Sequence, residues 1–364
     1  MQKNLTTRIG PMLLLALVSM NSFAQGITTP RTPSPAAMVS QTIGISTVKV
    51  KYSRPSIRNR VVWGELVPYG WNVAPGGTTN LAPWRAGANE NTVIEFSHPV
   101  KVEGQSVPAG SYGLFFVINK DDSGEIILSR DYRAWGNFFY TPEHDQLRAK
   151  IQLRSAPQTE ILTYEFINDE KNSAELVLNW EKKQFPVKIE FAVDEIVLAN
   201  AEAELNGIMG FQWQAYNSAA NYALQNNVAL DKAAGWIEKS MAIGGNNAFP
   251  TFRMKADILR KQGKEADADK IMADAIAIAA EVDLNNYGYQ LLNQKNFDKA
   301  IEILLLNTQR HAKSANAWDS LGEAYALKGD KKNAITNFKK SLALNPPEAT
   351  KANSEKYLKQ LGAM

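Results

Sequence analysis

Apolar and polar residues alternate over much of the first half of the chain. From about Ile43 to Val193, apolar side chains recur at every second position, as in Val48, Val50 and Tyr52. Successive side chains of a strand point to opposite faces of a sheet, so this period of two predicts strands with one buried face. About nine such strands with short polar connections predict an antiparallel β-sandwich over residues 36–194.

Two segments of this half give more detailed expectations. Ser111–Asn119 is apolar on both faces, which is typical of a central strand. Leu176–Trp180 and Val187–Val193 alternate on either side of the polar residues Glu181–Gln184. Because this spacer has the length of a hairpin loop, the pattern predicts two separate strands here.

A different pattern begins after Glu195. The apolar period becomes 3.6 and alanine becomes frequent, which predicts helices. Residues 315–348 resemble the tetratricopeptide repeat, whose diagnostic small and large residues stand here as Trp318, Leu321, Gly322, Tyr325, Gly329, Ala334, Phe338 and Pro346. One period of 34 residues earlier, the same places hold Leu284, Tyr287, Gly288, Leu291, Ala300 and Leu304.

Two less regular units precede these repeats, and an amphipathic segment, Ala349–Leu361, follows them. A single helical hairpin cannot bury its apolar face alone, so about three or more hairpins must stack. The pattern therefore predicts a tetratricopeptide-like α-solenoid over residues 200–364, with the last segment as its capping helix.

The first helix of each tetratricopeptide repeat lines the concave face, where partners bind. The residues between the packing positions are Asn285 and Tyr289 in one unit and Asp319 and Glu323 in the next. Amide, phenol and carboxylate groups in this order are candidates for contact with a protein or peptide. Two alternatives stay open: these side chains are only solvated, or the array serves as a clamp that holds the β domain.

The connection between Tyr52 and Thr92 is unusually long and contains four Pro, three Trp and four Arg. A connection of this length inside a compact domain is usually functional or disordered, and its Trp and Val content argues against disorder. Arginine and ring faces together form surfaces that bind sugars, carboxylates or peptides. The alternative is structural: the aromatic residues fix the loop onto the sandwich, and Arg85 pairs with Glu90 or with backbone carbonyls.

A second segment rich in Arg and Trp, Arg130–Gly136, follows a predicted strand and is expected at the same end of the sandwich. Glu90 could act as a general base if it is buried, because desolvation raises the pKa of a carboxylate. No matching acid or nucleophile accompanies it. The candidate ligand-binding residues are Arg54, Arg85, Asn89, Glu90, Arg130 and Trp135.

The stretch from Pro35 to Val193 resembles the bacterial domain-of-unknown-function family 2911. The matching pieces are Tyr52-Ser53-Arg54-Pro55, Trp63-Gly64-x-Leu66-Val67-Pro68-Tyr69-Gly70, Trp84-Arg85-x-Gly87-Ala88-Asn89-Glu90 and Pro108-Ala109-Gly110-x-Tyr112-x-Leu114-Phe115. The resemblance implies an exported, β-rich domain and brings no established activity. The family pattern is shorter at Asn72–Pro83, so the geometry of this loop does not follow from the resemblance.

Composition excludes several classes of function. The 40 Lys and Arg against 37 Asp and Glu give a net charge of +3, too small for a broad field that binds nucleic acid. The absence of Cys excludes disulfides and thiolate metal sites. His98, His144 and His311 lie far apart, and no catalytic or nucleotide-binding motif is present. We therefore expect no metal, no cofactor and no catalytic residue.

The first residues have the layout of a secretory signal peptide. Lys3 and Arg8 precede the apolar run 12–18, and Ser22 and Ala24 are the small residues of a cleavage site before Gln25. We expect a signal peptide at 1–24 and a tether at 25–35. The mature chain is then periplasmic or secreted, without a membrane span.

These patterns together predict an exported, non-enzymatic binding or scaffold protein. Its repeats would engage a protein or peptide, and the loop of its β domain a small ligand or glycan. The alternative is a carbohydrate-handling or hydrolytic enzyme that uses the Arg85 and Glu90 loop.

Overall fold

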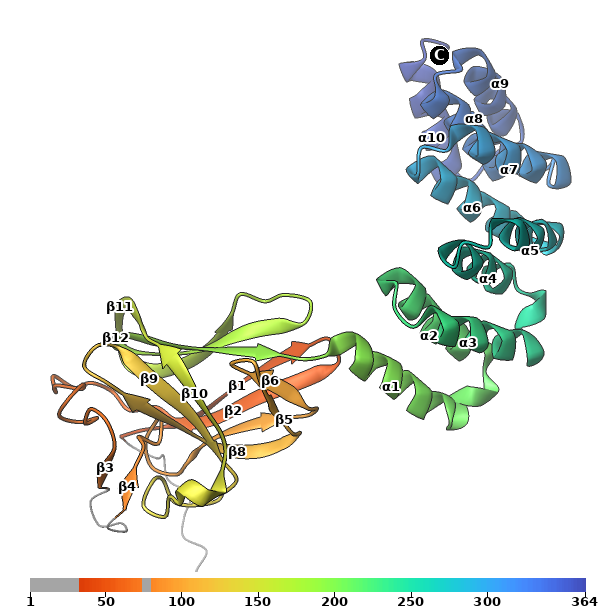
Figure 1. Ribbon diagram of the computed structural model, residues 1–364. Coiled ribbons are helices and arrows are strands. Elements are labelled where there is room, and N and C mark those ends of the chain that lie inside the picture. The colour runs from red at the N-terminus through yellow and green to blue at the C-terminus, as the bar shows by residue number, and fades with distance from the viewer. Residues whose placement is uncertain (1–32, 74–79) are drawn as a thin grey trace, which may run out of the picture. The chain divides into compact units, whose positions relative to one another are not determined.

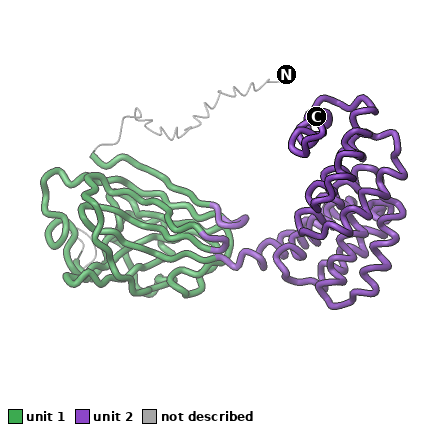
Figure 2. The backbone as a smooth tube through the Cα atoms, turned by 90° about the horizontal axis from the view of Figure 1, so that it is seen from above, with its two compact units in different colours: residues 1–41, 47–169, 173–190 green, residues 42–46, 170–172, 191–364 purple. Residues whose placement is uncertain are grey.

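The computed structural model describes residues 33–73 and 80–364, which form two compact units (Figure 2). Of the described residues, those up to 41, 47–169 and 173–190 belong to the first unit, and 42–46, 170–172 and 191–364 to the second. The first is built of antiparallel sheets and the second of helical hairpins, which confirms the expected fold class. The expected signal peptide, residues 1–24, lies outside the described residues.

The first unit contains two large sheets (Figure 1). The six-stranded sheet has the order β1 (Ala36–Ile43), β2 (Ser46–Ser53), β5 (Thr92–Phe96), β8 (Gly110–Ile118), β9 (Ser123–Ser129) and β10 (Asp145–Gln152). The four-stranded sheet has the order β11 (Arg154–Ile167), β12 (Ser173–Glu190), β6 (Val100–Val102) and β7 (Gln105–Val107). Two short strands, β3 (Asn72–Val73) and β4 (Leu81–Ala82), pair with each other.

Strand β8 lies between β5 and β9, and its residues from Tyr112 to Ile118 are all buried. A strand covered on both faces has no need for polar alternation, so the expectation of a central strand is confirmed. Strand β1 was not anticipated. It forms an edge of its sheet and most of its side chains are at least partly exposed, so it carries a weak apolar pattern.

The expected hairpin at Glu181–Gln184 is wrong. Strand β12 runs without interruption from Ser173 to Glu190. Glu181 has a φ of 54°, and the register between β11 and β12 shifts near Thr159, its partner. A bulge of this kind bends a strand without ending it, so polar residues that resemble a turn remain inside the strand.

The second unit begins with α1 (Val193–Leu205) and continues as four hairpins and a final helix (Figure 1). The hairpins are α2 (Trp213–Asn226) with α3 (Leu230–Ala242), α4 (Phe249–Lys261) with α5 (Glu265–Ile278), α6 (Glu281–Asn293) with α7 (Phe297–Arg310), and α8 (Ala315–Lys328) with α9 (Lys331–Ala343). The final helix, α10 (Glu348–Gln360), packs against α8 and α9.

Small residues allow close packing within these hairpins. Ala300 and Ala334 are fully buried, and Gly322 faces the ring of the buried Phe338. These are the packing positions that the repeat pattern predicts. Among the described residues, no helix is both long and apolar enough to cross a membrane.

Candidate functional site

The long connection after β2 is attached to both large sheets. The backbone N–H of Trp84 donates to the carbonyl of Phe116 at 2.8 Å, and the N–H of Phe116 donates back at 2.9 Å. Ser56 forms a bridge with Ile161 of β11. Ser56 and Trp84 therefore anchor the described parts of this connection to the β domain.

Four large rings meet beneath this connection. Trp63, Trp84, Trp180 and Phe185 have ring centroids 5.5–5.9 Å apart in five pairs. Trp180 and Phe185 come from β12, where they are almost completely buried. Aromatic side chains of this size contribute strongly to the stability of a core, and they move little once they are packed together. The cluster gives the connection a rigid base.

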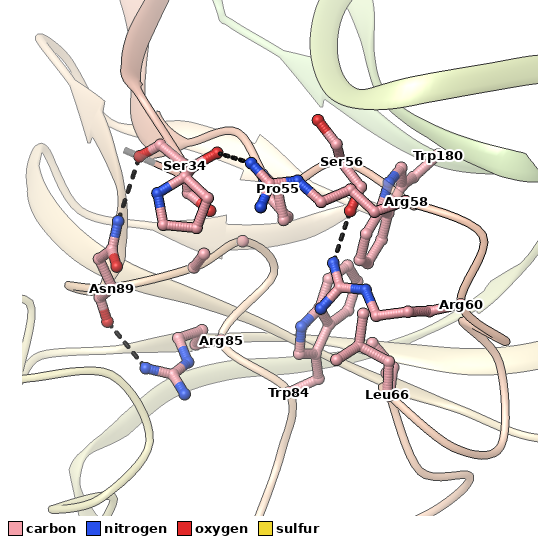
Figure 3. Close-up of a pocket in the computed structure, with 14 residues that line it drawn as sticks. Ser34, Pro55, Ser56, Arg58, Arg60, Leu66, Trp84, Arg85, Asn89 and Trp180 are labelled. Atoms are coloured by element: carbon pink, nitrogen blue, oxygen red, sulfur yellow. Dashed lines mark hydrogen bonds between the residues drawn. The ribbon is translucent and has the colours of Figure 1, made fainter. Parts of the chain in front are cut away.

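A pocket of about 240 Å³ opens above these rings (Figure 3). Trp84 and Trp180 contribute to its wall, and Arg58, Arg60 and Arg85 supply its positive charge. The described residues that line the pocket include no Asp or Glu.

Backbone carbonyls hold Arg60 and Arg85 in place. Arg60 donates from Nε to the carbonyl of Ile57 at 2.9 Å and from Nη2 to that of Ser56 at 2.6 Å. Arg85 donates from Nη1 to the carbonyl of Asn89 at 2.8 Å. Such bonds position a guanidinium, but they leave its charge unneutralised and most of its five N–H donors available.

None of the three guanidinium groups forms an ion pair with another residue in the described part of the chain. Glu160 bonds to the backbone of Arg58 and not to its guanidinium group: Glu160 Oε1 accepts from the Arg58 N–H at 3.1 Å. Arg85 is half-buried, and desolvation lowers its pKa from the usual value. The ring of Phe138 lies 5.3 Å from its guanidinium carbon. The pocket is therefore strongly cationic.

Unusual backbone conformations surround the pocket. Arg58 and Asn89 have φ values of 52° and 61°, in the left-handed region. Each such residue costs about 1–3 kcal/mol, and the surrounding structure must hold it. Gly136 lies so close to Arg85 that a Cβ there would be 2.6 Å from Nη1. Gly136 thus lets Arg85 lie against the second Arg- and Trp-rich segment.

The structure brings only two of the six candidate ligand-binding residues into this pocket, namely Arg85 and Asn89. The third, Arg54, points to β11, where Nη2 donates to Thr163 Oγ1 at 2.7 Å. Glu90 lines a different pocket beside Lys51.

The last two candidates belong to the segment that follows β9. Arg130 Nη2 donates to the carbonyl of Glu143 at 2.9 Å, and Trp135 is 50% exposed. Arg58, Arg60 and Trp84 belong to the Arg- and Trp-rich connection that was expected to form a binding surface, although they are not among the six candidate residues. No signal pointed to Trp180, which reaches the pocket from a distant strand.

Three of the four residues predicted for the concave repeat face, Tyr289, Asp319 and Glu323, form an internal network. Glu323 accepts from the Tyr289 hydroxyl of α6 at 3.0 Å and from the Tyr357 hydroxyl of α10 at 3.1 Å. Asp319 accepts from Asn353 Nδ2 at 2.8 Å and from the Ser354 hydroxyl.

Burial raises the pKa of Asp319 and that of the Tyr289 hydroxyl. The amide oxygen of Asn285 is buried without a hydrogen-bond partner among the described residues. Tyr289, Asp319 and Glu323 thus bind neighbouring helices and are not simply solvated.

Titratable residues do not gather into a metal centre. In residues 33–73 and 80–364, no group of three or more His, Asp or Glu side chains is arranged to hold a metal ion. His144 Nδ1 lies 2.6 Å from Asp131 Oδ2, an exposed pair outside the pocket.

Comparison with known proteins agrees with this division. Residues 34–189 match the family DUF2911, described as a protein of unknown function. This match covers the N-terminal domain. Residues 315–348 match the tetratricopeptide repeat, so the DUF2911 domain is followed by repeats of that type. No curated protein matches the chain.

Several solved structures resemble part of the chain. Pseudomonas aeruginosa pilF is 22% identical, with 41% of this chain and 68% of that chain covered and a TM-score of 0.28. YrrB, a TPR protein with an unusual peptide-binding site, is 21% identical, with 45% and 84% covered and a TM-score of 0.28. MamA from Desulfovibrio magneticus RS-1 is 16% identical, with 42% and 94% covered and a TM-score of 0.26. Similarities at these TM-scores support no inference about function.

Proposed function

We propose that this protein is an exported scaffold whose helical repeats bind another protein. The observation that carries the proposal is the polar ladder along α6, α8 and α10, in which Tyr289, Glu323 and Tyr357 occupy equivalent positions. Stacked repeats present one continuous surface, and such surfaces serve as binding sites in solenoid proteins.

Apolar side chains flank this ladder. Val282 and Leu327 are 61% and 49% exposed. Val282 precedes Tyr289 by seven residues, and Leu327 follows Glu323 by four, so each shares a helix face with its ladder residue. Exposed apolar groups beside ordered polar groups are typical of protein interfaces. The proposed partner surface therefore consists of the ladder together with Val282 and Leu327.

The test uses the full chain with a C-terminal affinity tag, recovered from the exported fraction of a bacterial culture. An intact mass that starts at Gln25 is expected if residues 1–24 are removed on export. Proteins captured by this chain are compared with those captured by a Val282→Asp, Leu327→Asp variant. We expect the variant to lose its partner, because two charges enter an apolar contact.

Leu305→Asp is the matched control. Leu305 is 39% exposed, but it lies on α7, the second helix of its hairpin. This variant is expected to retain the partner. Equal capture by all three chains, or equal loss in both variants, would contradict the proposed surface.

We also propose that the β domain contributes a ligand site, and the cationic pocket supports this second part. The enzymatic alternative depends on Arg85 and Glu90 acting together. These two residues line different pockets, so no observation favours the alternative, and it stays a hypothesis.

A further inference from the structure

The pocket over β12 concentrates positive charge that the described part of the chain does not neutralise. Arg58, Arg60 and Arg85 line one cavity of about 240 Å³, and their side chains donate hydrogen bonds to backbone carbonyls. Holding three cations close together costs free energy, and partial burial of Arg85 increases that cost. A site built in this way gains stability from a negative charge.

A second observation concerns the wall of the pocket. Trp180 is 1% exposed, and its indole N–H has no hydrogen-bond acceptor among the described residues. A buried donor without a partner costs about 1–3 kcal/mol, and native structures rarely keep one without a reason. The lining of this pocket therefore combines three cations and a buried indole, and none of its described residues is a carboxylate.

We infer that this pocket binds a small oxyanion, a carboxylate or a phosphate, carried by a ligand with an apolar face. Guanidinium groups bind both oxyanions through paired hydrogen bonds, and the Trp84 ring provides an apolar wall. The inference rests on the ligand site of the proposed function and names its ligand class.

The size of the pocket limits the ligand. Sites that enclose a drug-sized molecule measure roughly 300–1,000 Å³, so a cavity of about 240 Å³ accepts one anionic group and a small attached ring or chain. A neutral sugar is a poorer fit, because hydroxyl groups do not neutralise three cations. An extended polyanion also does not fit within this volume.

The test measures binding of three small probes to the full chain by titration calorimetry. Benzoate and phenyl phosphate represent the two oxyanions, and benzamide is the neutral control of similar shape. We expect benzoate or phenyl phosphate to bind at least about tenfold more tightly than benzamide, since charge-assisted hydrogen bonds are stronger than neutral ones. Whichever oxyanion binds more tightly identifies the source of the charge.

Arg60→Gln tests the pocket itself. Arg60 is exposed and makes only local carbonyl contacts, so the variant is expected to fold. It should bind the preferred oxyanion about tenfold more weakly. Arg130→Gln is the matched control, because Arg130 is also exposed, also bonds to a carbonyl and lies outside the pocket. It should bind like the unmodified chain.

Three results would overturn the inference: no binding of either oxyanion at millimolar concentration, equal binding of benzamide, or equal weakening in both arginine variants. Capture of a protein partner through Val282 and Leu327 is a separate measurement. If capture persists while the oxyanions fail to bind, only the ligand class is wrong. If capture fails while an oxyanion binds, only the repeat surface is wrong.

Discussion

Gly322 shows how a single residue governs the packing of a repeat. A Cβ at this position would lie 2.9 Å from Cδ1 of Phe338, which is fully buried. The ring has no room to withdraw, so Gly322 is required by a close approach. Gly235 lies within α3 in the opposite situation, because a Cβ there would meet no atom within 4 Å.

We predict opposite effects of alanine at these two helix positions. Gly322→Ala should lower the free energy of unfolding by about 1–3 kcal/mol, the usual cost of overpacking. Gly235→Ala should raise it by about 0.5–1 kcal/mol, since alanine is the better helix former. Denaturant unfolding with an unchanged m-value measures both. A Gly322→Ala variant as stable as the unmodified chain would show that contact with Phe338 is unimportant, and a destabilised Gly235→Ala variant would contradict the argument from helix propensity.

At the scale of elements, α10 closes the end of the array through polar bonds to α8. Asp319 is 4% exposed and accepts hydrogen bonds from Asn353 and Ser354 of α10. Desolvation raises the pKa of Asp319, and the neighbouring Glu323 raises it further, although the two hydrogen bonds oppose this shift. The interface between α8 and α10 thus contains a titratable group, Asp319.

The raised pKa predicts a pH dependence. The unfolded chain has an Asp pKa of about 3.9, so the folded chain holds the Asp319 proton more tightly. Asp319 stabilises the fold most when it is protonated. This contribution to stability is lost as the pH rises from about 4 through the higher folded-state pKa. Asp319→Asn removes this titration. The variant should therefore gain stability relative to the unmodified chain as the pH rises, by at most about 1.4 kcal/mol per pH unit.

Urea unfolding between pH 4 and pH 7 measures this difference, with the exposed Asp274→Asn as the control. The control should follow the unmodified chain at every pH. A difference for Asp319→Asn that does not change with pH would mean that the proton on Asp319 has no influence on folding.

At the scale of the whole molecule, each unit has its own core. Phe185 is fully buried in the β domain against Trp63, Trp84 and Phe116, and Phe338 is fully buried in the repeats against Tyr357. A packed core unfolds cooperatively, so each unit, which has its own core, should unfold independently of the other.

Matched substitutions test this separation. Phe185→Ala and Phe338→Ala should each destabilise their own unit by about 3–5 kcal/mol. Hydrogen exchange followed by mass spectrometry should show faster opening only in the first unit for Phe185→Ala and only in the second unit for Phe338→Ala. Faster exchange throughout the chain in either variant would mean that the two units unfold together.

Local pattern predicted the elements well and the candidate site only in part. The buried faces of β8 and the packing at Gly322 repeat at short spacing, so they are visible in the sequence. The hairpin expected at Glu181–Gln184 failed because a bulge keeps polar residues within β12. Among the candidate ligand-binding residues, Arg85 and Asn89 meet because they are only four positions apart, whereas Arg54 and Arg130 bond to other segments.

The sequence by itself determined the two classes of structure and the order in which they follow one another, because a period of two or of 3.6 residues reports which faces must be buried. It also placed a cluster of Arg and Trp in one connection. Only the tertiary structure decided which of these side chains share a cavity, that Trp180 joins them from β12, and that α10 engages the acidic groups of α8. These contacts join residues that are distant in the chain. They depend on how whole elements pack, and the local hydrophobic period contains no information about that packing.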